Sequence, residues 1–330
     1  MSTSSSTPLV AMENVTVRFR GAQTVHAVNG VSLTLEPGKV LGILGESGSG
    51  KSVTLKTLLR LLPESRTDIG GKVMVDGRDV LAMNAAELSA YRGAVTSMIF
   101  QDPALALDPV YTVGQQIAES ITRHEKISAK AAMARALELL ELVRIPSPER
   151  RLKAYPHEMS GGMRQRAMIA LALAARPKLL LADEPTTALD ATVQIQILLL
   201  LRQLQRDLGM GVIFVTHDIG VAVEVSDRLA VMYAGQIVET GTVRELLRNP
   251  QHPYTKGLLA ANLHGAKKGE RLEAIPGAPP ALNEPPSSCS FAPRCRYAEP
   301  ACGTALPPAL SLGDARTVRC IRAEAGLQPA

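Results

Sequence analysis

The chain has 330 residues, of which 46% are hydrophobic and 20% charged, a composition typical of a globular protein with about two domains' worth of material. Aromatic residues make up only 3%, with no tryptophan, which argues against stacking platforms for single-stranded nucleic acid. The net charge of +5 comes from 36 basic and 31 acidic residues of interspersed sign, so it indicates a solvated surface rather than a nucleic-acid partner.

The start of the chain predicts no export. Residues 1–7 are polar and uncharged, without the basic and apolar regions of a secretory signal. No apolar run approaches the ~20 residues that a membrane span needs. The longest candidates, residues 168–175 and 197–201, are short enough to be buried helix. We therefore expect a cytosolic chain, which serves a membrane process only by docking onto other subunits.

The N-terminal part of the chain predicts strands and one helix. Alternating apolar residues indicate strands over residues 9–43, and the apolar run 40–44 leads into glycines like a buried strand. Residues 51–62 then have helical periodicity, which stops at Pro63. Asp76-Gly77, flanked by apolar residues, predicts a hairpin.

The middle of the chain is predicted to be mostly helical, and helices then alternate with strands. Residues 84–155 predict an inserted helical subdomain, with helices at 85–92, 113–119 and 129–143. From residue 160 onwards helices alternate with buried strands, which indicates a parallel sheet covered on both faces. The expected elements are helices at 163–175 and 192–208, strands at 179–182 and 212–215, and a hairpin of 229–233 with 236–239.

The C-terminal part contains all the cysteines. Residues 264–288 are rich in proline and glycine and predict an extended linker. The segment beyond has too few apolar residues for a core of its own, and such a module usually needs a metal staple. Because disulfides are rare in the cytosol, the thiols favour a metal over cross-links. They are Cys289, Cys295, Cys302 and Cys320.

A glycine-rich segment predicts phosphate binding. Gly45-Glu46-Ser47-Gly48-Ser49-Gly50-Lys51-Ser52 fits the pattern G-x-x-x-x-G-K-S/T. The glycines let backbone N–H groups wrap phosphates, and the loop opens a helix whose N-terminus carries about half a positive charge. Lys51 is expected to reach the β- and γ-phosphates of ATP, and the Ser52 hydroxyl to bind Mg²⁺.

Two carboxylates follow the apolar run 179–182, namely Asp183 and Glu184. Ligands of open parallel sheets lie at the carboxyl ends of the strands. Asp183 is therefore expected to face the Mg²⁺ of the nucleotide, through water. Glu184, one residue on, is expected to act as the general base on the water that attacks the γ-phosphate.

A second segment identifies a family. Ser160-Gly161-Gly162-Met163-Arg164-Gln165 resembles the signature of ABC ATPases, usually written L-S-G-G-Q, with Met159 and Met163 in place of the usual Leu and Gln. Ser-Gly-Gly at a helix start is another anion site, made of exposed amides, a hydroxyl and the helix dipole. Because one nucleotide pocket needs only one such site, we infer that the second serves the ATP of a partner.

Other elements of the ABC family occur in the same order. Gln101 resembles the Q-loop glutamine near Mg²⁺, Asp190 in Ala188-Leu189-Asp190 resembles the D-loop, and His217 resembles the switch histidine. Phe19 lies at the distance expected for the aromatic residue that stacks on adenine. The resemblance implies an α/β fold, an ABC-type P-loop NTPase core. It has a mainly parallel sheet, an N-terminal antiparallel β subdomain, a helical insert and a small Cys-rich C-terminal extension.

The resemblance also implies a mechanism. Two ATPase domains close head to tail around two ATPs, closure moves membrane subunits and hydrolysis resets them. Lys51, Mg²⁺ and the partner's Ser160–Gly162 hold the phosphate charge, Glu184 activates water, and His217 contacts the γ-phosphate. The helical insert near Gln101 contacts a cytoplasmic helix of a membrane subunit.

The extension narrows the resemblance to the ATPases of peptide importers. The segments that carry it are His252-Pro253-Tyr254-Thr255 and 275–280. The expected domains are an ABC ATPase domain over 8–250, with its helical subdomain at approximately 84–160, and an extension over 251–330. The cysteine spacing C-x5-C-x6-C-x17-C matches no zinc ribbon built from C-x2-C pairs. Four thiolates can hold a 4Fe–4S cluster or one zinc ion. The family suggests the cluster; zinc or unligated thiols stay open.

The combined interpretation is the ATP-hydrolysing subunit of a bacterial dipeptide or oligopeptide importer, peripheral on the cytoplasmic face of the plasma membrane. The expected partners are a second, non-identical ATPase chain, two membrane-spanning permease subunits and an extracytoplasmic substrate-binding protein, without nucleic acid. Glutathione, nickel or an antibiotic peptide are alternative cargoes. A soluble ABC ATPase acting on ribosomes or DNA is disfavoured by the single cassette without a heptad run, and a binding-only pseudo-ATPase by Glu184.

Overall fold

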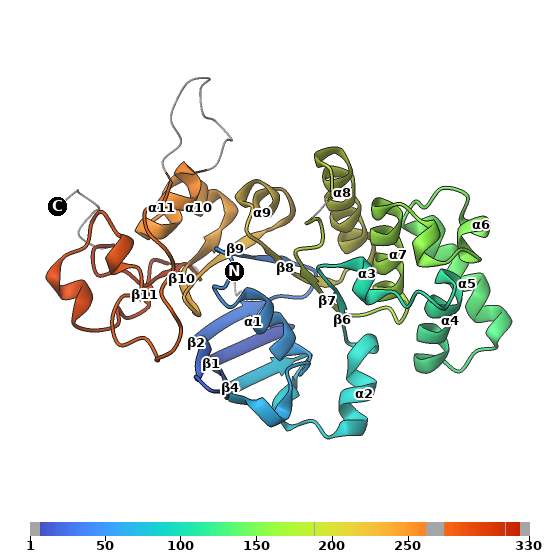
Figure 1. Ribbon diagram of the computed structural model, residues 1–330, viewed down its shortest axis with the longest axis horizontal. Helices are drawn as coiled ribbons and strands as arrows, with labels where there is room; N and C mark the ends of the chain where they lie inside the picture. The colour runs from blue at the N-terminus through green and yellow to red at the C-terminus, as the bar shows by residue number, and fades with distance from the viewer. Residues whose placement is uncertain (1–6, 188, 262–273, 314, 324–330) are drawn as a thin grey trace, which may run out of the picture. The chain divides into compact units, whose positions relative to one another are not determined.

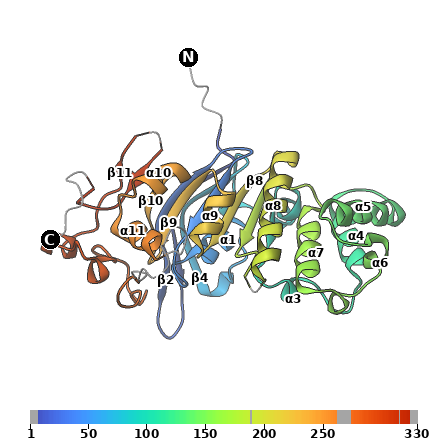
Figure 2. The ribbon, with the colours of Figure 1, turned by 90° about the horizontal axis from the view of Figure 1, so that it is seen from above.

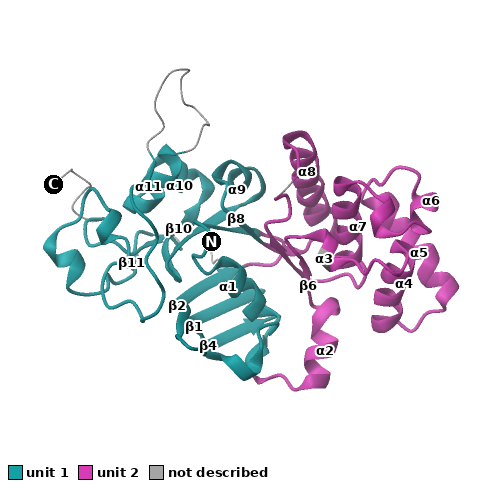
Figure 3. Cartoon of the chain, viewed as in Figure 1, with its two compact units in different colours: residues 1–35, 40–81, 214–330 teal, residues 36–39, 82–213 magenta. Residues whose placement is uncertain are grey.

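The chain folds into two compact units. The computed structural model describes residues 7–187, 189–261, 274–313 and 315–323 (Figure 1). Unit 1 is formed by residues 1–35, 40–81 and 214–330, and unit 2 by residues 36–39 and 82–213 (Figure 3). Each unit thus draws on segments far apart in the sequence.

Unit 1 begins with an antiparallel sheet of strand order β2-β1-β4-β5. β1 (Val10–Phe19) pairs with β2 (Val25–Leu35) and with β4 (Thr67–Val75). Asp76 and Gly77, with φ of 49° and 74°, form the turn into β5 (Arg78–Asp79). Two consecutive positive φ values suit the right-handed twist of a tight hairpin, so the hairpin predicted at Asp76-Gly77 is confirmed.

The second set of strands in unit 1 contains both core and extension. β3 (Val40–Leu44) runs parallel to β9 (Arg228–Tyr233), which forms the predicted hairpin with β10 (Gln236–Thr242). Two short strands of the extension, β11 (Leu310–Ser311) and β12 (Thr317–Val318), follow, and β12 pairs with β10. The extension therefore continues a sheet that begins in the ATPase core.

The first helix of unit 1, α1 (Lys51–Leu58), ends before the predicted boundary at Pro63. Arg60 has a φ of 47°, its N–H donates to Thr57 O at 3.0 Å, and the Leu61 N–H donates to Lys56 O at 3.0 Å. This pair of bonds around one left-handed residue is a Schellman cap, which closes the helix without a glycine or proline. The hydrophobic period continued beyond the helix, so periodicity alone overestimated its length.

The other described α-helices of unit 1 lie between residues 219 and 260. Among them, α10 (Val243–Arg248) packs against β9 and β10 (Figure 2). The helices are α9 (Ile219–Val225), α10 (Val243–Arg248) and α11 (Pro253–Ala260), and single 3-10 turns lie at Glu64–Arg66, Val80–Ala82, Ala292–Arg294 and Pro300–Gly303.

One apolar cluster joins the extension to the core of unit 1. Tyr254 is fully buried and Phe291 is 3% exposed, and both pack with Tyr233 of β9. The Phe291 ring lies 5.3 Å from the centroid of each tyrosine ring. Aromatic rings in such tilted and edge contacts bury large areas. Tyr254 and Phe291 of the extension thus pack in the core of unit 1, in keeping with the prediction that the extension has too few apolar residues for a core of its own.

Unit 2 contains a parallel strand pair and the predicted helices, with further short helices between them. β6 (Thr96–Ile99) pairs with β7 (Leu179–Asp183). β8 (Gly211–Thr216) begins in unit 2 and ends in unit 1. The helices are α2 (Ala85–Ala94), α3 (Pro103–Ala106), α4 (Val113–His124), α5 (Ala129–Leu142), α6 (Pro148–Leu152), α7 (Gly161–Leu173) and α8 (Ala191–Leu208). No helix in the part of the chain that is described is long and apolar enough to cross a bilayer.

Candidate nucleotide site and cysteine module

The phosphate loop Gly45–Ser52 connects β3 to α1 in unit 1, in the strand–loop–helix order expected from the sequence. Gly48 and Gly50 have φ of 78° and 103°, a region that favours glycine. A Cβ at Gly45 would lie 2.2 Å from the carbonyl oxygen of Met232, and one at Gly50 would lie 2.4 Å from that of Ala27. The loop therefore passes too close to other backbone for side chains at these glycines.

Lys51 is folded back onto its own loop. Its side chain is buried, and Nζ donates hydrogen bonds to the carbonyl oxygens of Gly45 and Glu46, both at 2.8 Å. Ser52 follows it in the first turn of α1 and is half-buried. The loop thus holds one ammonium group at a helix N-terminus, where anions bind favourably.

The two predicted carboxylates lie at the end of β7 in unit 2. Asp183 is 4% exposed, and Glu184 has a φ of 45°. Glu184 Oε2 accepts from Thr187 Oγ1 at 3.1 Å and from Gln101 Nε2 at 3.4 Å. Because β6 and β7 run parallel with Ile99 beside Ala182, the residues just after both strands meet. The structure therefore brings Gln101 and Glu184 together.

The signature segment begins α7 in unit 2. Ser160 is the N-cap and accepts from the Met163 N–H at 3.3 Å. A Cβ at Gly162 would lie 2.9 Å from a methyl group of Val193, so the starts of α7 and α8 pack closely. Asp190 caps α8 by accepting from the Val193 N–H at 2.9 Å. The predicted signature and D-loop are therefore neighbours, although Ala188 of the D-loop lies outside the described residues.

The last two predicted nucleotide contacts lie in unit 1. His217 is exposed, directly after β8 and before Asp218, the N-cap of α9. Phe19 is half-buried at the end of β1, paired with Val25 and Thr67. Unit 1 thus carries the phosphate loop, Phe19 and His217, while unit 2 carries Gln101, the signature, the two carboxylates and Asp190.

Two residues of the extension that belong to no nucleotide-binding motif contact the phosphate loop. Tyr254 Oη accepts a hydrogen bond from the Glu46 N–H, and the Arg294 guanidinium pairs with the Glu46 carboxylate. Tyr254 belongs to the segment His252-Pro253-Tyr254-Thr255 that carries part of the family resemblance, and Arg294 directly precedes Cys295. No local pattern links them to residue 46, since these contacts span more than 200 positions, with separations of 208 and 248.

The four cysteines line one cavity in the extension, together with His252 and Phe291, and none is in a disulfide. Burial raises the pKa of the Cys289 and Cys320 thiols, and raises that of Cys295 to about 11. A bound cation would reverse this shift, because it stabilises thiolates. Among the described residues, no group of three or more His, Cys, Asp or Glu side chains is arranged to hold a metal ion. The four thiols line the same cavity and are chemically suited to bind a metal, but their side chains are not arranged in the geometry of metal ligands.

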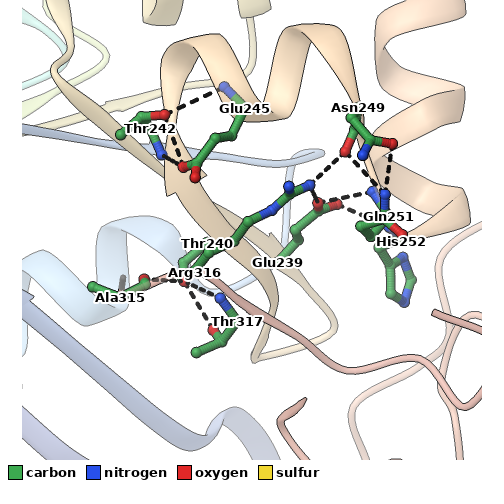
Figure 4. Close-up of polar contacts among 10 residues, drawn as sticks. All are labelled: Glu239, Thr240, Thr242, Glu245, Asn249, Gln251, His252, Ala315, Arg316 and Thr317. Atoms are coloured by element: carbon green, nitrogen blue, oxygen red, sulfur yellow. Dashed lines mark hydrogen bonds and ion pairs between the residues drawn. The ribbon is translucent and has the colours of Figure 1, made fainter. Parts of the chain in front are cut away.

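A buried acidic residue ties the extension to β10 (Figure 4). Glu239 is fully buried and accepts from the backbone N–H groups of Gln251 at 2.8 Å and His252 at 2.9 Å. Arg316 lies 3.4 Å from Glu239 and donates to Asn249 O. Burial lowers the pKa of His252 to about 3, so its ring is neutral, and Nδ1 accepts from the Tyr254 N–H at 3.0 Å. This network fixes the start of α11, and with it Tyr254.

Two segments of the chain match known protein families. The family described as "ABC transporter" matches residues 28–187, and the family described as "Oligopeptide/dipeptide transporter, C-terminal region" matches residues 238–302. The oligopeptide transport ATP-binding protein OppD of Bacillus subtilis (strain 168) is 49% identical over 317 residues, which cover 95% of this chain and 88% of that protein.

Solved structures show the same fold. The dimeric, post-hydrolysis structure of the ATP-binding cassette MJ0796 bound to ADP and Pi has a TM-score of 0.64 and 31% identity, over 71% of this chain and 99% of that one. The cbiO1 structure from Clostridium perfringens, part of the ABC transporter complex cbiONQ, has a TM-score of 0.64 and 25% identity, over 74% and 92%. The chain therefore belongs to the ABC transporter family, among the ATP-binding proteins of oligopeptide and dipeptide transporters.

Proposed function

We propose that the chain is the ATP-hydrolysing subunit of an ABC importer that takes up dipeptides and oligopeptides across the bacterial plasma membrane. The observation that carries this proposal is the presence of two anion-receptive helix starts in one chain, the phosphate loop at α1 and Ser160–Gly162 at α7. The peptide class rests on the C-terminal family match and on the OppD relative.

In unit 1, the amides of Gly45–Ser52 and the Lys51 ammonium would hold the β- and γ-phosphates. Ser52 would bind Mg²⁺, Phe19 would stack on adenine, and His217 would contact the γ-phosphate. Bound Mg²⁺ supplies neutralisation of charge on the phosphate oxygens. A hydroxyl, a carboxylate and an amide oxygen are the hard oxygen ligands that this ion prefers. The buried carboxylate of Asp183, which belongs to unit 2, fits that chemistry.

In unit 2, Glu184 would accept the proton of the attacking water. Its contacts to Gln101 and Thr187 hold the carboxylate in one direction, as a positioned base requires. Gln101 and Asp183 would complete the surroundings of Mg²⁺. Ser160, Gly161, Gly162 and Asp190 would contact the nucleotide bound by a partner ATPase chain, which we propose is non-identical.

The remaining partners follow from this role. Two permease subunits would span the membrane, an extracytoplasmic binding protein would deliver the peptide, and this chain would lie on the cytoplasmic face. Val110 and Tyr111, between α3 and α4, are 70% and 53% exposed. Large apolar side chains at such exposure suit a docking contact with a cytoplasmic helix of a permease. We assign residues 8–250 to the ATPase domain, with the helical subdomain at 84–160, and residues 251–330 to the extension.

Membrane attachment tests this function. Expressed with its two permease subunits, the chain is expected to sediment with membranes and to support peptide uptake. Val110→Asp is expected to reduce both at least about tenfold, because it places a charge in an apolar contact. Leu142→Asp, which changes an exposed leucine of α5 in the same unit, is the matched control and should retain both. A chain that sediments with ribosomes instead of membranes contradicts the proposal.

The extension is proposed to hold a 4Fe–4S cluster, with zinc as the alternative, in a structural role. Protein purified without oxygen is expected to be brown, with the broad visible absorption of iron–sulfur proteins and about four irons per chain. Cys302→Ser should remove the colour, because it removes the buried thiol of the set. Colourless protein containing one zinc per chain would exclude the cluster.

A further inference from the structure

Glu46, the second residue of the phosphate loop, is held from two sides by the extension. Its carboxylate accepts two parallel hydrogen bonds from Arg294, Oε2 from Nη1 at 2.7 Å and Oε1 from Nη2 at 3.0 Å. Its N–H donates to Tyr254 Oη at 2.9 Å. The ion pair is mostly shielded from water, with side-chain exposures of 6% for Arg294 and 28% for Glu46. Bidentate, shielded pairs of this kind are the strong ones.

Arg294 is itself locked in place. Nε donates to Pro276 O at 2.7 Å, and Nη1 also donates to Tyr233 Oη at 3.2 Å. The guanidinium carbon lies 5.7 Å from the ring centroid of Tyr233 and 6.0 Å from that of Phe291. Because these contacts hold the planar guanidinium group on all sides, Arg294 offers Glu46 an immobilised partner and not a mobile charge on the surface.

The contact continues from Glu46 to the lysine of the loop. The Glu46 carbonyl oxygen accepts a hydrogen bond from Lys51 Nζ at 2.8 Å. A displacement of Glu46 would therefore change the position of the ammonium group, while Tyr254 keeps the Glu46 N–H turned towards the extension. The sequence places Arg294 directly before Cys295, so the residue that pairs with Glu46 is a chain neighbour of one of the four cysteines.

We propose that Arg294 and Tyr254 are positioning residues of the nucleotide site, through which the cysteine-bearing extension sets the affinity of the phosphate loop for nucleotide. They touch the loop and no reacting atom. This inference rests on the proposed function, namely that the loop binds ATP. It gives the extension a role in nucleotide binding in addition to any role in stability.

Titration of the full chain with Mg²⁺ and a non-hydrolysable ATP analogue tests the inference. Arg294→Gln and Glu46→Gln are each expected to weaken binding about 5- to 30-fold, since each leaves its partner's charge uncompensated. The double variant should bind no more weakly than the weaker single variant, because the two residues act as one unit. Arg294→Lys keeps the charge but loses the fork, so its affinity should lie between wild type and Arg294→Gln.

Two milder variants separate positioning from folding. Tyr254→Phe removes only the hydroxyl that fixes the Glu46 N–H and should weaken binding roughly threefold. Thr317→Val also removes one hydroxyl from the extension, the partner of Thr240 Oγ1 at 2.8 Å, and should bind like wild type. Unfolding temperatures measured without nucleotide report any general loss of stability in each variant.

Three results of these titrations would contradict the role of Arg294 and Tyr254 in nucleotide binding. Affinities of Arg294→Gln and Tyr254→Phe within about twofold of wild type overturn the inference. It is also overturned if the double variant of Arg294 and Glu46 loses as much binding free energy as the two single variants together. A Thr317→Val loss as large as that of Tyr254→Phe also overturns it, because the effect would then be general. If the wild-type chain itself binds no nucleotide, the proposed function fails. If the wild-type chain binds nucleotide and the variants bind it equally well, only the inference about the extension fails.

Discussion

Lys51→Ala is expected to abolish nucleotide binding and peptide uptake. The side chain is buried, and its ammonium group already lies on the carbonyl oxygens of Gly45 and Glu46, where incoming phosphate oxygens would compete for it. Removing a shielded cation from a site for a polyanion leaves the negative charge uncompensated. We expect the affinity for Mg²⁺ and ATP to fall by more than about 100-fold.

Isothermal titration of the purified chain measures that loss. Lys56→Ala is the matched control, since it removes a half-buried lysine from the same helix, beyond the first turn. It should bind ATP as wild type does. Near-normal binding or turnover in Lys51→Ala would remove the phosphate-loop assignment, and with it the proposed role of the whole segment Gly45–Ser52.

Glu184→Gln is expected to separate binding from hydrolysis. The substitution keeps the shape and leaves an oxygen to accept from Thr187, but it removes the carboxylate that would take the proton of the attacking water. Loss of a positioned general base costs ~10²–10⁴-fold in rate. Because ATP would still bind but not be consumed, the variant should accumulate as a closed assembly of two ATPase subunits.

Single-turnover hydrolysis and size-exclusion chromatography with ATP give the two readouts. Glu141→Gln, an exposed glutamate of α5 in the same unit, provides a control with the same chemical change. It should hydrolyse ATP normally and should not shift the assembly state. Hydrolysis within about tenfold of wild type in Glu184→Gln would mean that the base lies elsewhere.

Local patterns in the sequence were enough to predict most elements. The helices α5 and α8 and the strands β7 and β8 lie within about two residues of their predicted bounds, because their hydrophobic periods and flanking turn residues are written locally. The early end of α1 was missed, since a left-handed arginine at position 60 carries no strong sequence signal.

The residues of the candidate site were also predicted where the signal is local in the sequence. The glycine, lysine and carboxylate residues were found because phosphate chemistry needs those residue types at fixed spacing, and the pairing of β6 with β7 then brought Gln101 to Glu184. Their roles in catalysis stay predictions until the variants are measured. The four cysteines were predicted to act together, and they line one cavity, although not as a preset group of metal ligands.

The sequence by itself indicated the family, the phosphate-binding chemistry and the elements with a clear hydrophobic period, since each of these depends on residues close together along the chain. It did not predict β6, which lies inside the segment expected to be helical. Only the tertiary structure decided that Phe291 packs in the core of unit 1 and that Arg294 holds Glu46, 248 positions away. The physical reason is that an ion pair depends on distance in space, and the fold sets that distance without leaving any periodic trace in either segment.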